Sequence, residues 1–321
     1  LTDFFLRQLS VRSGEPWFAM LTHNRPHPPL IAPHPYNRMH DPKGIPPPIR
    51  LANADEEAAV HPFMAASMKR DPIRGMIEEH GCRLDNESAA DIAELRSVYY
   101  GLASEVDHHV GRVIRFLEES GQLDGTLVVI TSDHGEMLGD SRLWQKTSYH
   151  DAAFHVPLII RDPDRVSMHG GEVDDFTESV DLVPTVLDWL SGDIPSAMDG
   201  LSLLQHLEGH RPDSIVAELD FGEPDSPTEL QRELGLGLRE ANLTLLRERR
   251  FKLVHFNGGL PPLLFDMAST ETETRNLARD PAHADELLRM TAKLLDHRMR
   301  NADRTLSDMK LTDRGTINHR P

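Results

Sequence analysis

Cysteine is almost missing from this sequence. The 321 residues contain a single cysteine, Cys82, in the polar segment HGCRLD. One thiol excludes an internal disulfide framework, and it suits a reducing compartment in which thiols stay reduced. We therefore expect the protein to reside in the bacterial cytoplasm.

Basic residues and long apolar runs are also scarce. Lys and Arg number 34 against 52 Asp and Glu, which gives a net charge of -18 and an isoelectric point near 5.4. Such a charge repels nucleic acid and anionic lipid, so we expect neither as a partner, and an anionic substrate would need a local basic pocket. No apolar run approaches the roughly 18 residues of a spanning helix, and no signal-peptide pattern opens the sequence. The first residues, LTDFFLRQLSVRSGEPWF, resemble the middle of a protein.

The most informative stretch runs from Thr126 to Lys146, TLVVITSDHGEMLGDSRLWQK. Its apolar run without alternation predicts a strand covered on both faces in the middle of a parallel sheet. Asp133 and His134 then fall at the carboxyl end of this strand, where open α/β sheets bind ligands, and Gly135 lets the backbone turn closely behind them. The tripeptide Asp-His-Gly by itself is equally compatible with a polar turn.

Apolar periodicity predicts the regular elements around this stretch. Recurrence at threes and fours predicts helices over 1–10, 88–120, 176–190 with a break near Pro184, and 284–300. Apolar runs predict strands at 17–21 and 155–161, and later in the sequence at SIVAELD, LTLLRERR, FKLVHF and PLLFDM. These patterns predict an α/β domain over residues 1–209, and a smaller antiparallel sheet with one helix over 210–321.

A proline- and histidine-rich segment, residues 22–48, follows the predicted strand at 17–21. Proline blocks helices and central strands, so the segment is predicted to be a rigid loop that leaves the carboxyl end of a strand. Loops in that position frequently hold functional residues. Four histidines on it are candidates, although each could also be an ordinary surface histidine: His23, His27, His34 and His40.

Two further segments show no sustained period. Residues 52–86 are predicted to be a surface excursion, suited to a lid or an oligomer contact, and residues 301–321 have little apolar content and are predicted to be an oligomer arm.

Three sequence runs together resemble the sulfatase family of the alkaline phosphatase superfamily, and most closely its phosphonate monoester hydrolase and arylsulfatase branch. These runs are PWFAMLTHNRPHPP, TSDHGEMLGDSRLWQKTSYHDAAFHVPLIIRDP and FKLVHFNGGLPPLLFDMASTETETRNLA. The resemblance implies an alkaline-phosphatase-like fold with a mostly parallel sheet flanked by helices, of which residues 1–209 would be the C-terminal part. It also implies a homo-oligomer, either a dimer or a tetramer, and a small anionic ester as substrate.

The resemblance also implies roles for single residues. It matches Asp133 and His134 to metal ligands, Lys146 to a lysine that contacts an ester oxygen, and His27 to the histidine of a Pro-His-Pro motif that faces the ester. One carboxylate oxygen and one imidazole nitrogen suit a single divalent cation, Mn²⁺ or Ca²⁺, with Zn²⁺ as the alternative. An ammonium group at Lys146 would stabilise negative charge on a sulfuryl or phosphoryl group.

The family's nucleophile is not found in this sequence. Family members use a formylglycine made within a Cys/Ser-x-Pro-x-Arg motif, whereas Cys82 is followed by Arg83, Leu84 and Asp85. We interpret the sequence as a piece that begins after the nucleophile, and so expect a metal-dependent hydrolase of sulfate or phosphonate monoesters, with phosphodiesters as further candidates. Two alternatives stay open: a phosphodiesterase or phosphomutase with a Ser or Thr nucleophile, and an inactive relative that binds metal or anion. Ser141 stands where many relatives have histidine, so it is assigned no role.

Overall fold

The computed structural model describes residues 1–12, 14–69, 73, 76–77, 84–195, 197–206, 212–269, 273–301 and 309–318. The chain forms two compact units: Leu1–Ala59 with Phe63–Gly171, and Val60–Pro62 with Glu172–Pro321. The predicted domain boundary after residue 209 differs from the division between these two units, which falls after Gly171, and it stays a prediction. Cys82 lies outside the described residues. No helix in the described ranges is both long enough and apolar enough to cross a bilayer.

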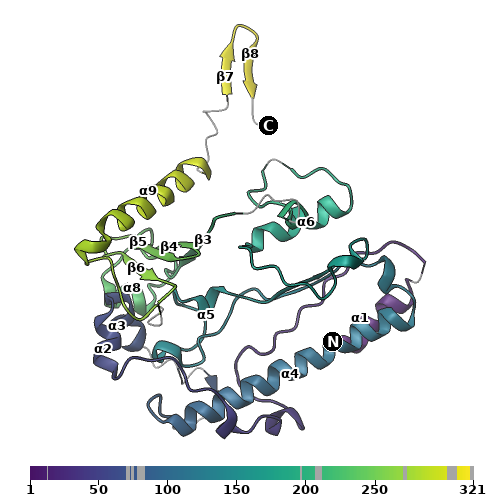
Figure 1. Cartoon of the computed structure of the whole chain (residues 1–321), viewed down its shortest axis with the longest axis horizontal. Coiled ribbons are helices and arrows are strands. Elements are labelled where there is room, and N and C mark those ends of the chain that lie inside the picture. Colours follow the sequence, from purple (N-terminus) through teal and green to yellow (C-terminus); the bar gives the residue numbers. More distant parts are fainter. Residues whose placement is uncertain are drawn as a thin grey trace. The chain divides into compact units, whose positions relative to one another are not determined.

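The first unit consists mainly of helices and long connections (Figure 1). Its regular elements are α1 (Thr2–Ser10), α2 (Ala54–Ala59), α3 (Pro62–Lys69, whose first residue belongs to the second unit), α4 (Ala89–Glu119), β1 (Val128–Thr131), α5 (Asp151–Phe154) and β2 (Leu158–Arg161).

The helix α4, which has 31 residues, confirms the helix predicted over 88–120. The Ser88 hydroxyl accepts a hydrogen bond from the Asp91 N–H at 3.3 Å, which satisfies a donor that the first turn leaves free. At the other end Gly121 takes a left-handed φ of 68°, a conformation that commonly stops a helix.

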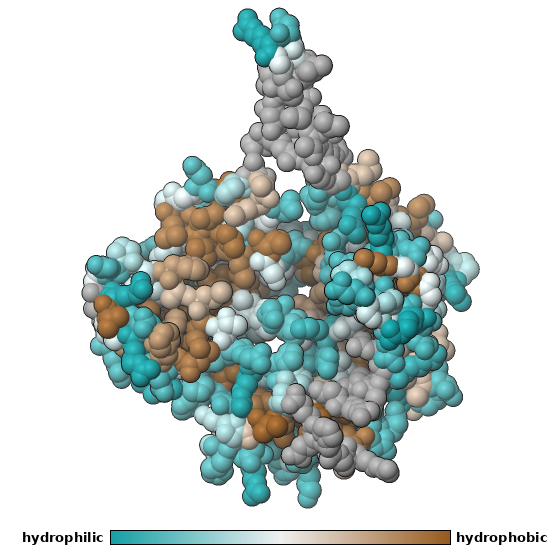
Figure 2. Space-filling view, turned by 180° about the vertical axis from the view of Figure 1, so that it is seen from behind, coloured by the Kyte–Doolittle hydropathy of each residue, from teal (hydrophilic) through white to brown (hydrophobic). Residues whose placement is uncertain are grey.

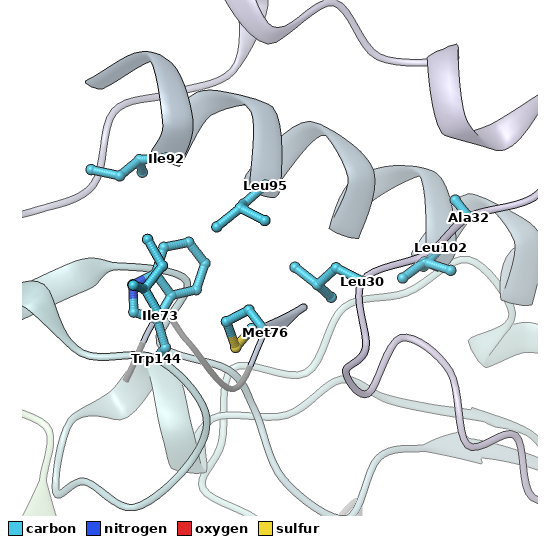
Figure 3. Packing of buried hydrophobic residues seen from close by; sticks show 8 residues of the cluster. All are labelled: Leu30, Ala32, Ile73, Met76, Ile92, Leu95, Leu102 and Trp144. Atoms are coloured by element: carbon cyan, nitrogen blue, oxygen red, sulfur yellow. The ribbon is translucent and has the colours of Figure 1, made fainter. Parts of the chain in front are cut away.

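The apolar stripe of α4 holds the two loops that contain His27 and Lys146. Leu30, three residues after His27, and Trp144, two residues before Lys146, both pack in the buried cluster along this helix (Figure 3). The two loops are therefore fixed against the same rigid element, although they are more than a hundred residues apart in the sequence. The buried members of the cluster are Leu30, Ala32, Ile73, Met76, Ile92, Leu95, Leu102 and Trp144.

The strand β1 corrects one prediction. It pairs with β2 in an antiparallel ladder in which Val129 lies opposite Ile160, so the described strands of this unit show no parallel pairing. The three apolar residues of β1 are half-buried. An unbroken apolar run is common in parallel strands because both of their faces are covered, but the direction of pairing depends on the connection between the strands, which the run does not determine.

Two other predictions for this unit were wrong. Residues 17–21 are extended but unpaired among the described strands, and Phe18 and Met20 are 82% and 80% exposed. The described part of 52–86 is not a surface excursion, because it contains α2 and α3 and buries Phe63 and Met64. An apolar run such as 17–21 forms a strand only where a neighbouring strand accepts its hydrogen bonds. Helices as short as α2 and α3 have too few turns for their apolar period to be recognised in the sequence.

The second unit contains an antiparallel sheet, a smaller hairpin and helices. Its elements are α6 (Leu182–Trp189), α7 (Leu203–His206), β3 (Ser214–Asp220), α8 (Glu229–Leu234), β4 (Asn242–Glu248), β5 (Phe251–Phe256), β6 (Leu263–Asp266), α9 (Ala284–Asn301), β7 (Met309–Thr312) and β8 (Gly315–Asn318). The four predicted strands and the predicted C-terminal helix are confirmed. The predicted break near Pro184 was wrong: this proline sits in the first turn of α6, where its missing N–H needs no partner.

The sheet has the order β3-β4-β5-β6, with each strand antiparallel to the next. Its register places Leu246, Leu253 and Leu264 in one row across three strands. Because side chains alternate between the faces of a strand, this row points to a single face. Helix α9 lies beside this sheet (Figure 1), and its residues Met290 and Leu294 complete a buried cluster with these leucines.

Candidate active site

The site begins where β1 ends, at Ser132, Asp133 and His134. The Ser132 hydroxyl donates to the His134 carbonyl oxygen at 2.9 Å, and the His134 N–H donates to Asp133 Oδ1 at 3.1 Å. These local bonds close a tight turn. The Asp133 side chain is 85% exposed and that of His134 is 28% exposed, so the turn presents the carboxylate to solvent and partly covers the imidazole.

Gly135 is required by the packing of this turn against α5. A Cβ at this position would lie 2.0 Å from the Ala152 carbonyl oxygen. The Gly135 N–H instead donates to the Ala153 carbonyl at 2.8 Å, and the Glu136 N–H donates to that of Ala152 at 2.9 Å. The close backbone turn that Gly135 predicts is confirmed, and any side chain here would push the end of the strand away from α5.

The His134 ring is held in one orientation. Its Nδ1 lies 2.8 Å from the Gly135 carbonyl oxygen, and only a protonated Nδ1 can donate to that acceptor. In the neutral imidazole Nε2 then keeps its lone pair. That lone pair accepts a hydrogen bond from Lys146 Nζ at 2.7 Å, and Nε2 lies 3.6 Å from Asp133 Oδ2. The structure therefore brings together three of the four predicted site residues.

The electrostatics of Asp133 follow from these neighbours. Burial opposes its ionisation, but the His134 ring when protonated, the surrounding backbone N–H groups and the Lys146 ammonium prevail, so the pKa of the carboxyl is lowered. Asp133 is therefore an anion at neutral pH, as a cation ligand must be.

Lys146 lies at the end of a loop with an unusual backbone. Among the described residues, six that are not glycine have positive φ, and four of these six belong to this loop: Leu138, Ser141, Arg142 and Gln145. The loop is closed by hydrogen bonds from the Met137 N–H to the Gln145 carbonyl at 3.0 Å and from the Gly139 N–H to the Leu143 carbonyl at 2.8 Å. Non-glycine residues in this conformation frequently occur at functional sites.

His27 is presented in the same manner as His134. Its Nδ1 lies 2.7 Å from the carbonyl oxygen of Pro28, the next residue, which leaves Nε2 at the exposed edge of the ring. Among the described side chains, His27 forms no hydrogen bond with Asp133, His134 or Lys146, so its convergence with Lys146 stays a prediction. Its ring also lies close enough to act on the carboxyl of Glu136. Burial raises the pKa of Glu136, while the N–H groups of Leu138 and Gln145, and His134 and His27 when protonated, act to lower it.

The other three histidines of the 22–48 loop have different surroundings. His40 Nε2 lies 2.9 Å from the Ser104 hydroxyl on α4, and the His23 ring stacks on that of His109 with 5.7 Å between centroids. His34 is exposed. The contacts of His40 and His23 do not involve Asp133, His134 or Lys146.

Asp133 and His134 fit a divalent cation as part of a ligand set. A carboxylate oxygen and an imidazole nitrogen 3.6 Å apart would bind the same ion once the Lys146 ammonium, which occupies the Nε2 lone pair here, moves aside. The bond from Nδ1 to a backbone carbonyl is the arrangement that commonly orients a metal-binding histidine. Within the described ranges no three His, Cys, Asp or Glu side chains form a metal-binding group, so the remaining ligands would come from elsewhere.

A solved structure defines the fold class. The phosphonate monoester hydrolase SpPMH from Silicibacter pomeroyi matches with a TM-score of 0.90 and 46% identity, over 99% of this chain and 63% of that one. The chain thus has the sulfatase-like α/β fold of the alkaline phosphatase superfamily, with a C-terminal antiparallel sheet, as predicted.

Family models agree with this fold. The model described as Sulfatase matches residues 1–192, and the model described as N-sulphoglucosamine sulphohydrolase, C-terminal, matches residues 139–300. The chain belongs to the sulfatase family.

Two curated relatives show how much of a family member the chain represents. The multifunctional alkaline phosphatase superfamily protein PehA of Trinickia caryophylli is 39% identical over an alignment of 330 positions, which covers 99% of this chain and 63% of that protein. An arylsulfatase of Clostridium perfringens is 29% identical over 65% of this chain and 42% of that protein. The chain thus spans less than two thirds of the length of these relatives.

One residue at this site was missed by the sequence analysis. Glu136 Oε1 accepts hydrogen bonds from the N–H groups of Leu138 at 3.3 Å and Gln145 at 2.5 Å. No periodic pattern predicts such bonds, because they depend on an irregular loop conformation. The only signal available was the position of an acid directly after Asp-His-Gly.

Proposed function

We propose that this chain is part of a metal-dependent hydrolase of sulfate or phosphonate monoesters, with phosphodiesters as further substrates. The names of its relatives support the proposal, since they include a phosphonate monoester hydrolase and an arylsulfatase. Because the chain spans less than two thirds of these relatives, the activity belongs to a longer protein of which this chain would supply several site residues.

The observation that carries the proposal is the contact of Lys146 Nζ with His134 Nε2 at 2.7 Å, beside the ionised Asp133. The Asp133 carboxylate balances the Lys146 ammonium, so a divalent cation held by Asp133 and His134 would make the site positive, in a protein whose net charge is -18. A positive site is what an anionic ester needs in order to bind here.

Each residue then has a defined role. Asp133 and His134 supply an oxygen and a nitrogen ligand to one divalent cation, Mn²⁺ or Ca²⁺, with Zn²⁺ as the alternative. When bound, the cation supplies polarisation of an ester oxygen. Lys146 donates to the oxygens of the sulfuryl or phosphoryl group, and His27 donates a proton or hydrogen bond to the departing oxygen. The nucleophile is a formylglycine outside these residues.

Activity and metal content of the full-length protein test these roles together. Wild type should hydrolyse 4-nitrophenyl sulfate or a 4-nitrophenyl phosphonate monoester. Lys146→Ala should lower turnover about 100-fold to 1,000-fold with the metal still bound, because one preorganised donor is lost. Asp133→Asn should lose the metal as well. Lys43→Ala, which removes an exposed lysine on another loop, is the matched control and should behave as wild type.

Two results would overturn the proposal. One is a full-length protein that hydrolyses none of these esters after metal loading, and the other is unchanged turnover in Lys146→Ala. Intact mass of the full-length protein tests the nucleophile separately, because conversion of cysteine to formylglycine lowers the mass, and an unshifted mass would exclude it.

We also propose that the protein is a dimer or tetramer in the bacterial cytoplasm and binds neither nucleic acid nor membranes. Large apolar side chains at the surface support self-association: Figure 2 shows several apolar areas, and Phe18, Met20 and Val11 are each more than three quarters exposed. A monomer in light scattering at micromolar concentration would contradict the oligomer, and recovery in the membrane fraction would contradict the location.

A further inference from the structure

Glu136 occupies a particular place in the loop that ends at Lys146. It is half-buried and follows Gly135 directly, and its side chain turns back into the loop. A single carboxylate oxygen, Oε1, accepts the N–H groups of both Leu138 and Gln145. One side chain therefore joins the beginning of the loop to its end.

The two residues that Glu136 binds are both strained. Leu138 has a φ of 48° and Gln145 has a φ of 66°, in the left-handed region that side chains other than glycine disfavour. Such a conformation costs about 1–3 kcal/mol per residue and persists only where the surroundings enforce it. Glu136 supplies part of that enforcement at both positions, since its hydrogen bonds hold the peptide planes that carry these two N–H groups.

Gln145 directly precedes Lys146, so its φ and ψ set the direction in which the lysine leaves the loop. On the other side of Gln145, Trp144 is fixed by burial against α4. The anchored Trp144 and the hydrogen-bonded Gln145 leave little backbone freedom, and so they fix the point from which the exposed Lys146 side chain reaches His134 Nε2.

We propose that Glu136 is a positioning residue that sets the place of the Lys146 ammonium by holding Leu138 and Gln145 in their left-handed conformations. The expected effect on turnover rests on the proposed function, whereas the expected effect of Glu136 on the loop backbone does not. An amide oxygen can accept the same two N–H groups, so the role requires the acceptor and not the negative charge.

Kinetics of single and double variants test whether Glu136 acts through Lys146. Glu136→Ala in the full-length protein should lower kcat by about 10-fold to 100-fold through misplacement of the ammonium. Glu136→Gln should restore most of that loss. The double variant Glu136→Ala/Lys146→Ala should be no slower than Lys146→Ala, because a misplaced group has no further effect once it is removed. Glu118→Ala, at an exposed position on α4, is the control.

Multiplicative losses in the double variant would overturn the proposal, and so would equal losses in the Ala and Gln variants. Hydrogen exchange gives a readout that needs no activity. The Leu138 and Gln145 amides should exchange faster in Glu136→Ala and as wild type in Glu136→Gln, while helix α9 is unchanged in both. If wild type hydrolyses no ester, the proposed function fails, and the exchange data still decide the role of Glu136: unchanged exchange in the Ala variant would refute it.

Discussion

The loop that ends at Lys146 and the sheet β3–β6 are built in opposite ways. The sheet consists of extended strands in register, with rows of leucines buried on its faces. The loop contains four strained residues and ends in an exposed lysine beside an exposed aspartate. Burial of apolar surface stabilises the sheet, whereas hydrogen bonds and strain position groups in the loop. From this difference we expect stability and the proposed catalysis to depend on different residues in this chain.

The difference between the loop and the sheet leads to an expectation that substitutions can test. Changes at exposed site residues should alter turnover and leave the free energy of unfolding nearly unchanged, while changes in buried rows should do the reverse. Each of the following variants therefore needs both measurements.

The largest effect is expected for His27→Ala with substrates that have poor leaving groups. If His27 assists departure of the oxygen, its loss should reduce turnover about 100-fold to 10,000-fold for alkyl esters and much less for 4-nitrophenyl esters. The free energy of unfolding in urea should change by less than about 0.5 kcal/mol, because the side chain is exposed. His34→Ala, on the same loop and also exposed, is the control. Equal losses for good and poor leaving groups would show that His27 does not act on the departing oxygen.

The second prediction concerns helix α9, where a substitution should change the free energy of unfolding and leave turnover normal. Leu294 is 5% exposed and packs on the sheet, whereas its neighbour Leu295 is 58% exposed. Leu294→Ala should destabilise the protein by about 2–5 kcal/mol through lost burial and a residual cavity. Leu295→Ala has the same helix propensity change and should lie within about 0.5 kcal/mol of wild type. Turnover per folded molecule should be normal in both, and a loss of turnover in folded Leu294→Ala would break the separation of roles.

The third prediction concerns acid stability of the second unit. His61 is 2% exposed, stacks on Phe256 and lies with Nε2 2.8 Å from the Pro261 carbonyl. Burial lowers the pKa of His61 from 6.5 to about 4. Between these values the unfolded chain binds a proton that the folded chain does not, so stability is complete above pH 6.5 and falls as the pH drops toward 4, by on the order of 3 kcal/mol.

Replacing His61 by Phe keeps a ring on Phe256 and removes the titration. Urea unfolding at pH 7.5, 6, 5 and 4.5 should show a smaller loss of stability on acidification in His61→Phe than in wild type, even if the variant is weaker at pH 7.5 through the lost hydrogen bond. Parallel curves for the two proteins would mean that His61 does not contribute to acid sensitivity.

Much of the regular structure could be predicted from the sequence, because periodic burial determines it. The predicted helices 88–120 and 284–300 end within one residue of α4 and α9. Strand direction at β1 and the burial of α2 and α3 could not be predicted, since both depend on partners distant in the sequence. At the site, periodicity and chain order placed Asp133 and His134 at a strand end, but only the resemblance singled out Lys146 and His27. The contact of Lys146 with His134 and the role of Glu136 depend on left-handed residues that no pattern reveals.

The smallest effect is expected at the N-terminus of α4, and it tests whether the site loops depend on the stability of the helix that anchors them. The Ser88 hydroxyl accepts the Asp91 N–H, and Ser88→Ala should cost about 1 kcal/mol because that N–H loses its acceptor in the first turn. Ser88→Asp should retain the cap and benefit from a negative charge near the helix N-terminus, so it should equal or exceed wild type in stability. Turnover should be unchanged in both variants, because Leu30 and Trp144 pack farther along the helix and remain buried. A reduced turnover in Ser88→Ala at a temperature where the protein is fully folded would mean that fraying of α4 reaches the loops of His27 and Lys146, and that stability and catalysis are coupled in the first unit after all.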